Sequence, residues 1–196
     1  MRRCLQWYRE MNARRPLAVK SATTCCIFSA SDTCAQFINP QGKEQDLRRT
    51  LDFALCGAGL TAPFFHGWYL ILDARLPGKR FWPIKLAMDA TLAAPVYIFL
   101  LMGMQRCLRL VGGSESSDNL RWEAWPTEAY NLWVDGLKVC PAYQAVNFAL
   151  VPPAYRVQWM NGCQFFWNIY VAYICGHAKE QERSLVADVV TPVVSQ

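Results

Sequence analysis

Two long stretches of the sequence, residues 53–72 and 157–178, contain no Asp, Glu, Lys or Arg. An α-helix rises about 1.5 Å per residue, so roughly 20 apolar residues cross the hydrocarbon core of a bilayer. Two shorter stretches, residues 90–105 and 139–155, also lack these charged residues. Charged residues make up 18% of the chain, below the roughly 25% of an ordinary soluble domain. This distribution predicts several membrane-embedded segments.

The mean hydropathy of +0.06 alone leaves a soluble helical bundle open, so the distribution of charge decides the class. Polar and apolar residues alternate only weakly, and the segments are twice as long as the strands of a membrane barrel. We therefore predict an all-α integral membrane bundle. Its five apolar segments are expected at residues 16–38, 50–72, 83–108, 132–151 and 157–176, with a short amphipathic stretch at 120–130.

The first 16 residues carry five arginines but no apolar core, so they do not form a secretory signal peptide. Trp7 and Tyr8 favour a short basic amphipathic helix on a membrane surface, and a mitochondrial address is the alternative. We expect residues 1–178 to form a single helical membrane domain. Residues 179–196 are predicted to be a polar C-terminal tail.

Several classes of function lack support in the sequence. The net charge of +5 is spread along the chain without a basic stripe, which argues against nucleic-acid binding. Nine cysteines form no CxxC pair, and two histidines lack an acidic cluster, so no metal ion or cofactor is expected. No nucleophile elbow, phosphate loop or catalytic carboxylate pair is found, so we do not expect an enzyme. The five segments leave nearly equal numbers of Lys and Arg on the two sides, so the positive-inside rule gives no orientation.

Polar groups inside the apolar segments are the informative ones, because an ionised side chain at bilayer depth costs several kcal/mol. Lys85 and Asp89 are one turn apart and are expected to be close enough to pair. Asp32 and Gln36 are also one turn apart, and Gln144 and Asn147 share a helix face. Two interpretations stay open: a polar path or solute pocket between helices, or interhelical hydrogen bonds that only fix the packing. The candidate polar lining is Asp32, Gln36, His66, Lys85, Asp89, Gln144 and Asn147.

The stretch "GAGLTAPFFHGWYLILD", residues 57–73, has features that weaken a plain hydrophobic span. Gly57 and Gly59 permit close helix approach, and Pro63 frees backbone carbonyls. His66 either titrates near neutral pH or anchors the membrane interface beside Trp68. Together these residues predict a kinked, tightly packed helix.

The same stretch resembles a signature of the Mpv-type, or 22 kDa peroxisomal membrane protein, family of small organelle membrane proteins. A second stretch, "PAYQAVNFALVPPAYR" at residues 141–156, is similar to the family's most specific box. The resemblance spans residues 7–173. The motif positions are Gly57, Gly59, Pro63, His66, Trp68, Tyr69, Pro141, Gln144, Asn147, Phe148, Val151, Pro152, Arg156, Trp167 and Tyr170.

The chain also departs from the family pattern. Ala90 stands where the family usually has glutamine after the third-segment aspartate, and Cys140 replaces a tryptophan before proline. Both departures remove groups that could line a path between the helices.

The resemblance implies an integral membrane protein of mitochondria or peroxisomes with four spans, so we expect four to five membrane-embedded helices. Some members form weakly selective channels, and none has established catalysis. The arginine-rich start favours the mitochondrial inner membrane over the peroxisomal membrane. The expected function is a weakly selective small-solute channel contributing to membrane homeostasis; the alternative is a structural accessory subunit of a larger, for example respiratory, complex. The expected partners are the lipid bilayer and either further copies of the chain or such a complex.

Overall fold

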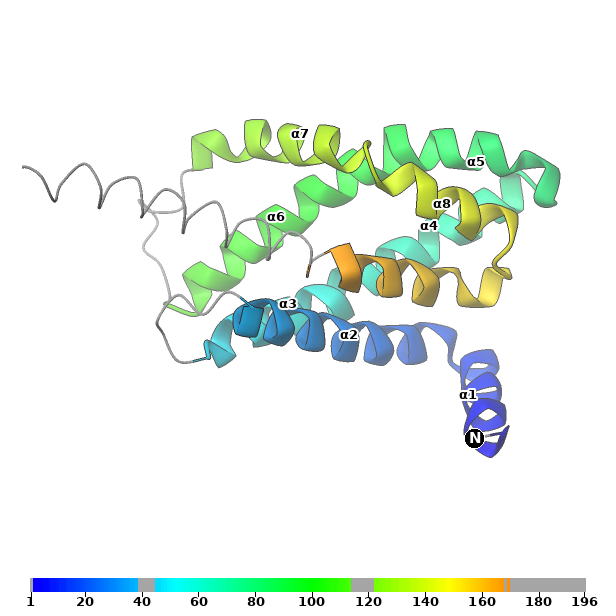
Figure 1. Cartoon of the computed structure of the whole chain (residues 1–196), viewed down its shortest axis with the longest axis horizontal. Helices are drawn as coiled ribbons and strands as arrows, with labels where there is room; N and C mark the ends of the chain where they lie inside the picture. Colours follow the sequence, from blue (N-terminus) through cyan, green and yellow to red (C-terminus); the bar gives the residue numbers. More distant parts are fainter. Residues whose placement is uncertain (1, 39–44, 114–121, 168, 170–196) are drawn as a thin grey trace, which may run out of the picture.

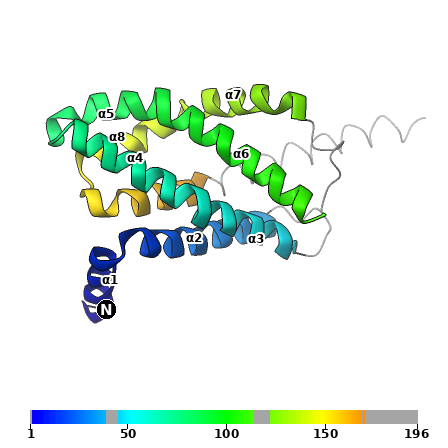
Figure 2. The same cartoon turned by 180° about the vertical axis from the view of Figure 1, so that it is seen from behind.

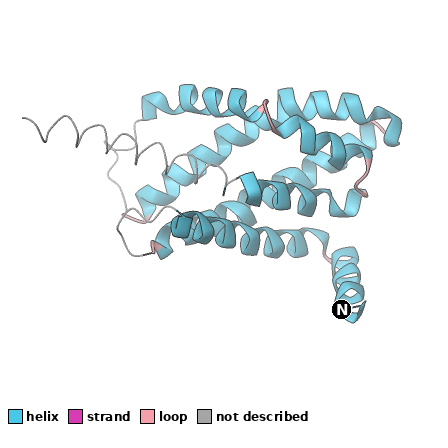
Figure 3. Ribbon diagram, viewed as in Figure 1, coloured by secondary structure: helices cyan, strands magenta, loops and turns pink. Residues whose placement is uncertain are grey.

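The computed structural model describes residues 2–38, 45–113, 122–167 and 169, and every regular element in those ranges is helical (Figure 3). The all-α class predicted from the sequence is confirmed. Residues 156–167 are also helical. The principal elements are α1 (Arg2–Arg14), α2 (Pro16–Ile38), α3 (Leu47–Cys56), η1 (Gly57–Thr61), α4 (Ala62–Arg75), η2 (Lys79–Phe81), α5 (Trp82–Met88), η3 (Asp89–Ala93), α6 (Ala94–Val111), η5 (Trp122–Ala124), α7 (Trp125–Gly136), α8 (Cys140–Ala149) and η6 (Pro153–Tyr155).

The predicted N-terminal helix is present as α1, which lies at one end of the bundle at a steep angle to α2 (Figure 1). Two hydrogen bonds join α1 to the C-terminal part of the bundle, one just before the last described helix and one within it. Asn12 donates to the carbonyl oxygen of Ala154 at 3.3 Å, and Gln158 donates to the Tyr8 hydroxyl at 2.8 Å. The orientation of α1 is therefore fixed by the bundle itself.

Among the described residues, two helices are long and apolar enough to cross a membrane, Leu47–Arg75 and Lys79–Val111. The first comprises α3, η1 and α4, and the second comprises η2, α5, η3 and α6; α4 and α6 slope in the same direction when the bundle is seen from behind (Figure 2). The first begins earlier than the expected residue 50, because the Asp46 side chain accepts from the backbone N–H of Arg49 as an N-cap.

Each of these two helices contains one π-helical turn, and each turn is followed two residues later by a proline. The turn η1 precedes Pro63, and the turn η3 precedes Pro95. A proline inside a helix removes a backbone donor and clashes with the preceding turn, and the wider π turn accommodates it. The predicted kink at Pro63 is therefore a local change of helix type within a continuous helix.

The sequence-based division between residues 120–130 and 132–151 is wrong. Helix α7 continues through this boundary to Gly136, and the chain is broken at residues 137–139, before α8. Pro141 explains the position of the break. It has no backbone N–H, and its ring excludes the residues before it from a continuous α-helix.

Beside its apolar core, the bundle buries an unusual number of polar side chains and exposes many apolar ones. Among the described residues, Asp32, Lys85, Asp89 and Asn147 are buried, whereas Leu70 is 60% exposed. Charged side chains are almost never buried in soluble proteins unless they are paired. A bilayer around the helices accounts for the exposed leucines, and inter-helix contacts account for the buried polar groups.

Close helix packing is found at one of the two glycines singled out in the sequence. A Cβ at Gly57 would lie 3.0 Å from the ring of Phe28 and 3.1 Å from the backbone oxygen of Thr24, both on α2. At Gly59 a Cβ would meet only a methionine side chain, at 3.6 Å. Gly57 is thus the position where α2 and the first long helix need a glycine.

Gly103 on α6 gives a sharper test of packing. A Cβ there would lie 2.5 Å from the ring of Trp125, which stacks on Phe99 with ring centroids 4.2 Å apart. We expect Gly103→Ala to displace Trp125 and lower the free energy of unfolding by about 1–3 kcal/mol. Thermal and denaturant unfolding of the purified protein in detergent measures this change.

The matched control is Gly67→Ala on α4, where no heavy atom lies within 4 Å of the added carbon. That variant should be as stable as the wild type or slightly more stable, because alanine is the better helix former. Equal losses in the two variants would show that Trp125 does not constrain Gly103.

Candidate functional site

The centre of the candidate site is the buried carboxylate of Asp89, the first residue of η3. Its Oδ1 accepts from the indole N–H of Trp68 at 3.0 Å, and its Oδ2 accepts from the amide of Gln144 at 2.7 Å. Trp68 lies on α4 and Gln144 on α8, so the carboxylate joins three helices. A buried carboxylate needs such donors, since its charge is otherwise uncompensated.

The hydrogen-bond network continues from Gln144 toward α4. Asn147 donates to Gln144 Oε1 at 2.8 Å and to the Tyr69 hydroxyl at 3.3 Å. The Tyr69 hydroxyl in turn donates to the sulfur of Met160 at 3.3 Å. The predicted common face of Gln144 and Asn147 is confirmed, and it points at the Asp89 network.

A cavity of about 90 Å³ lies beside this network. Apolar side chains form most of its wall, while Asp89 and Gln144 supply polar groups. Ala90 and Cys140, the two departures from the family pattern, also line it. Both are smaller than the glutamine and tryptophan that the family pattern has at these positions.

The cavity lies at the level where the helices are irregular. Pro95 has no N–H to offer the carbonyl of Ala90, and the indole of Trp133 on α7 donates to that carbonyl at 2.8 Å. Helix α7 packs on α6, and α8 packs on α5 (Figure 1). The break between α7 and α8 therefore faces the π turn η3.

This break is far from both ends of the bundle. The 12 residues of α7 span about 18 Å and the 10 residues of α8 span about 15 Å, which together match the hydrocarbon core of about 30 Å. Asp135 precedes the break and Lys138 lies within it, and the two form an exposed ion pair of 2.5 Å. Non-helical backbone and an exposed ion pair thus lie near the middle of the bundle.

Lys85 does not pair with Asp89, contrary to the expectation from their spacing. Its Nζ lies 2.5 Å from Asp73 Oδ1, and the same carboxylate binds Arg156 at 2.6 and 2.8 Å. Lys85 is 2% exposed and Arg156 is 4% exposed, so two buried cations share one carboxylate. The guanidinium of Arg156 also lies over the ring of Phe148, 5.4 Å from its centroid.

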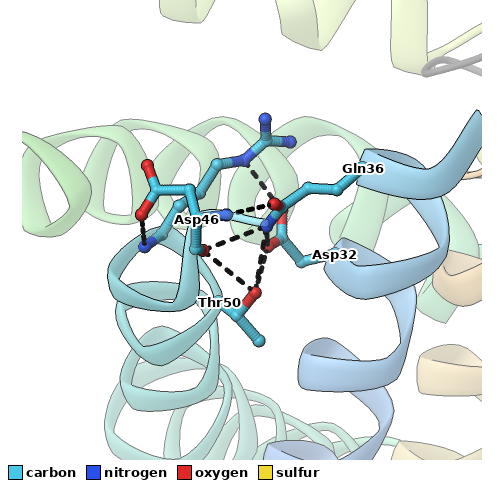
Figure 4. Close-up of polar contacts among 5 residues, drawn as sticks. Asp32, Gln36, Asp46 and Thr50 are labelled. Atoms are coloured by element: carbon cyan, nitrogen blue, oxygen red, sulfur yellow. Dashed lines mark hydrogen bonds and ion pairs between the residues drawn. The ribbon is translucent and has the colours of Figure 1, made fainter. Parts of the chain in front are cut away.

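Asp32 and Gln36 belong to a separate cluster between α2 and the start of α3 (Figure 4). Gln36 donates to Asp32 at 2.7 Å, which confirms the contact expected from their spacing. Asp32 also accepts from the Thr50 hydroxyl at 2.8 Å and pairs with Arg49 at 2.8 Å. Gln36 Oε1 accepts from the backbone N–H of Asp46 at 2.7 Å.

The clusters lie at different depths along the bundle. Thr50 and Asp73 belong to one continuous helix, and a rise of 1.5 Å per residue separates them by about 35 Å. The Asp32 and Asp73 clusters therefore lie near opposite ends, and the Asp89 network lies between them. His66 has a different partner, because its Nδ1 lies 3.0 Å from the Nζ of Lys20 on α2.

The predicted polar lining is thus divided among several clusters. The structure brings Asp89, Gln144 and Asn147 together, and it places Asp32 with Gln36, His66 with Lys20, and Lys85 with Asp73. The sequence pattern identifies Trp68, Tyr69 and Arg156 only as positions of the family motif and predicts no contact for Trp133. The available signal was that buried indole, phenol and guanidinium groups need hydrogen-bond partners.

The other family-motif positions contribute mainly to helix packing and to the connections between helices. Phe148 belongs to the apolar core with Tyr69, and the extended backbone of Pro152 separates α8 from the next helix. Trp167 is half-buried, and Tyr170 lies outside the described residues. Within the described ranges, no three His, Cys, Asp or Glu side chains are grouped as metal ligands.

Comparison with known proteins identifies relatives over most of the chain. The model of the Mpv17 / PMP22 family matches residues 115–172. Protein sym-1 of Neurospora crassa is 32% identical, over 88% of this chain and 99% of its own. PXMP2/4 family protein 4 of Dictyostelium discoideum is 30% identical, over 80% and 85% respectively. No solved structure matches.

The mitochondrial inner membrane protein Mpv17 of Caenorhabditis briggsae is 27% identical, over 82% of this chain and 87% of its own. This similarity confirms the predicted location in the mitochondrial inner membrane. The family resemblance drawn from the two motifs is confirmed as well. With a 30% or higher identity over most of two relatives, this chain belongs to the Mpv17 / PMP22 family.

Proposed function

We propose that this protein is a weakly selective channel for small solutes in the mitochondrial inner membrane and contributes to the homeostasis of that membrane. The observation that carries the proposal is the Asp89 carboxylate, buried beside a cavity at the level of a broken helix. We assign it no catalytic activity.

The proposal includes five helical passes through the bilayer. They are α2, the two long helices, the broken pair α7–α8, and the helix that begins near Arg156. The lengths of α7 and α8 together support one pass, because they add up to the thickness of the hydrocarbon core.

The α7–α8 break supports access of water to the middle of the bundle. Non-helical backbone at bilayer depth is tolerated where it is buried in protein or lines a water-filled cavity. Many transporters bind their solutes near the bilayer midplane, at helices interrupted in this way. The exposed Asp135–Lys138 pair also favours water over lipid on this side.

The interior network has unused hydrogen-bonding capacity. Asn147 Oδ1 is buried and accepts no hydrogen bond from the described residues. Asn147 does not line the cavity itself, but it donates to Gln144, which does. In the conformation described, Trp68 and Gln144 hold both oxygens of Asp89, so we propose that it is closed. Opening would exchange these contacts for water.

Planar-bilayer recording on the purified protein tests the proposal. We expect unitary conductance, and we expect Asp89→Asn to lower the preference for cations over anions by about fivefold. That factor corresponds to about 1 kcal/mol, the interaction of two unit charges at 4 Å in water. The control is Glu123→Gln, an exposed carboxylate in η5 near one end of the bundle, which should leave the selectivity unchanged.

The rival function is a structural accessory subunit of a larger inner-membrane complex. The exposed Asp135–Lys138 pair also fits this function, because a partner helix could cover it. A protein that is silent in bilayers and co-purifies stoichiometrically with a respiratory or similar complex would establish the subunit and end the channel proposal.

A further inference from the structure

The cationic side chains at the two ends of the bundle differ in their partners, although the sequence supplies nearly equal numbers to both sides. At the end where α3 begins and α6 terminates, carboxylates pair with three of the described arginines. The ion pairs there are Arg48 with Asp52, Arg49 with Asp32, and Arg106 with Glu128.

At the opposite end, five exposed cations lack such partners. No carboxylate of the described residues lies within ion-pairing distance of Arg14, Arg15, Arg75, Lys79 or Arg80. Arg80 lies over the ring of Phe81, 4.6 Å from its centroid, and this contact leaves its charge uncompensated.

The principal acidic group near this end does not offset the positive charge. Asp73 is engaged by both Lys85 and Arg156, so that cluster itself carries an excess of one cation. The two ends therefore differ in local charge even though their residue counts do not. The field at the α1 end is positive.

This end also has the geometry of a membrane interface. Two long helices meet here at the turn before η2, where Gly78 has a φ of 94°. Trp7 is 63% exposed and Trp82 is 37% exposed, and tryptophan is enriched at the level of lipid headgroups. Helix α1 and the start of α5 lie at the same end of the bundle (Figure 1).

We propose that the α1 end of the bundle binds the headgroups of anionic phospholipids through Arg14, Arg15, Arg75, Lys79 and Arg80. Cations near a bilayer surface attract anionic lipids. These five side chains come from α1, the connection to α2, the end of α4 and the turn after it, so they are spread over a face. A planar lipid surface fits this arrangement better than a single free phosphate, which requires converging donors.

The test uses full-length protein in detergent micelles that contain phosphatidylcholine. Phosphatidylglycerol is added, and bound lipid is counted by native mass spectrometry. We expect the wild type to prefer phosphatidylglycerol. Its apparent affinity should fall roughly fivefold for each cation removed, in Arg14→Gln with Arg15→Gln and in Lys79→Gln with Arg80→Gln. These side chains are exposed, so the variants should fold normally.

The control variant combines Arg48→Gln and Arg49→Gln at the other end and should keep the preference for phosphatidylglycerol. An equal preference in all variants, or its loss in the control alone, overturns the proposal. Displacement of the lipid by equimolar inorganic phosphate overturns it too, since it indicates a site for a free anion. None of these outcomes depends on whether the bundle conducts.

Discussion

Asp73→Asn is expected to be the most destabilising conservative substitution in the described bundle. It removes the one carboxylate that neutralises Lys85 and Arg156, which are both almost fully buried. Breaking a buried ion pair by removing one partner costs about 3–5 kcal/mol, because the remaining charge is left uncompensated. Two cations are left here, so we expect a loss at the upper end of this range, measured by unfolding in mixed detergent micelles.

The matched control is Asp135→Asn, which breaks an ion pair of the same length whose partners are 60% and 69% exposed. Exposed pairs contribute about 0–1 kcal/mol, so this variant should remain close to the wild type. A triple variant, Asp73→Leu with Lys85→Met and Arg156→Met, should recover most of the stability, because no charge is left buried. Equal losses from Asp73→Asn and Asp135→Asn would contradict this interpretation of the cluster.

Gln144→Glu is expected to have the second largest effect. The substitution changes hardly any volume but places a carboxylate where an amide now donates to Asp89 at 2.7 Å. Two carboxylates cannot share a buried site as ions, and neither has a cation within this network. We expect a loss of about 3 kcal/mol or more at neutral pH, as judged from the cost of burying an uncompensated charge.

A second substitution makes this prediction specific. Adding Asp89→Asn to Gln144→Glu restores a pair of one carboxylate and one amide. The double variant should therefore be more stable than Gln144→Glu alone. Gln158→Glu is the control, because the Tyr8 hydroxyl can reverse its role and donate to the new carboxylate. If the double variant is no more stable than Gln144→Glu alone, the Asp89–Gln144 contact does not hold these helices together.

The sequence predicts the contacts that follow from spacing within one helix. The bounds of α2 agree with the expected segment, and the contact of Gln36 with Asp32 follows from their separation by one turn. The proximity of Gln144 and Asn147 follows from the same geometry. Helical periodicity fixes these relations before any tertiary packing is known.

Contacts between distant segments could not be predicted in this way. Lys85 has a carboxylate one turn away on its own helix, yet it pairs with Asp73, which an intervening turn brings alongside. The break at residues 137–139 was also missed, since the charge pattern gives no sign of it and only Pro141 indicates it. Trp133 is a further example, because its partner is a backbone carbonyl freed by Pro95 on another helix.

The π turn at Gly57–Thr61 has a consequence for the phase of the helix that follows it. Such a turn holds one residue more than an α-helical turn, and each residue of an α-helix advances the angular position by about 100°. Shortening the turn by one residue would therefore swing Trp68 and Tyr69 a quarter of a revolution or more around the axis. Their ability to meet Asp89 and Asn147 depends on a single surplus residue two turns earlier in the chain.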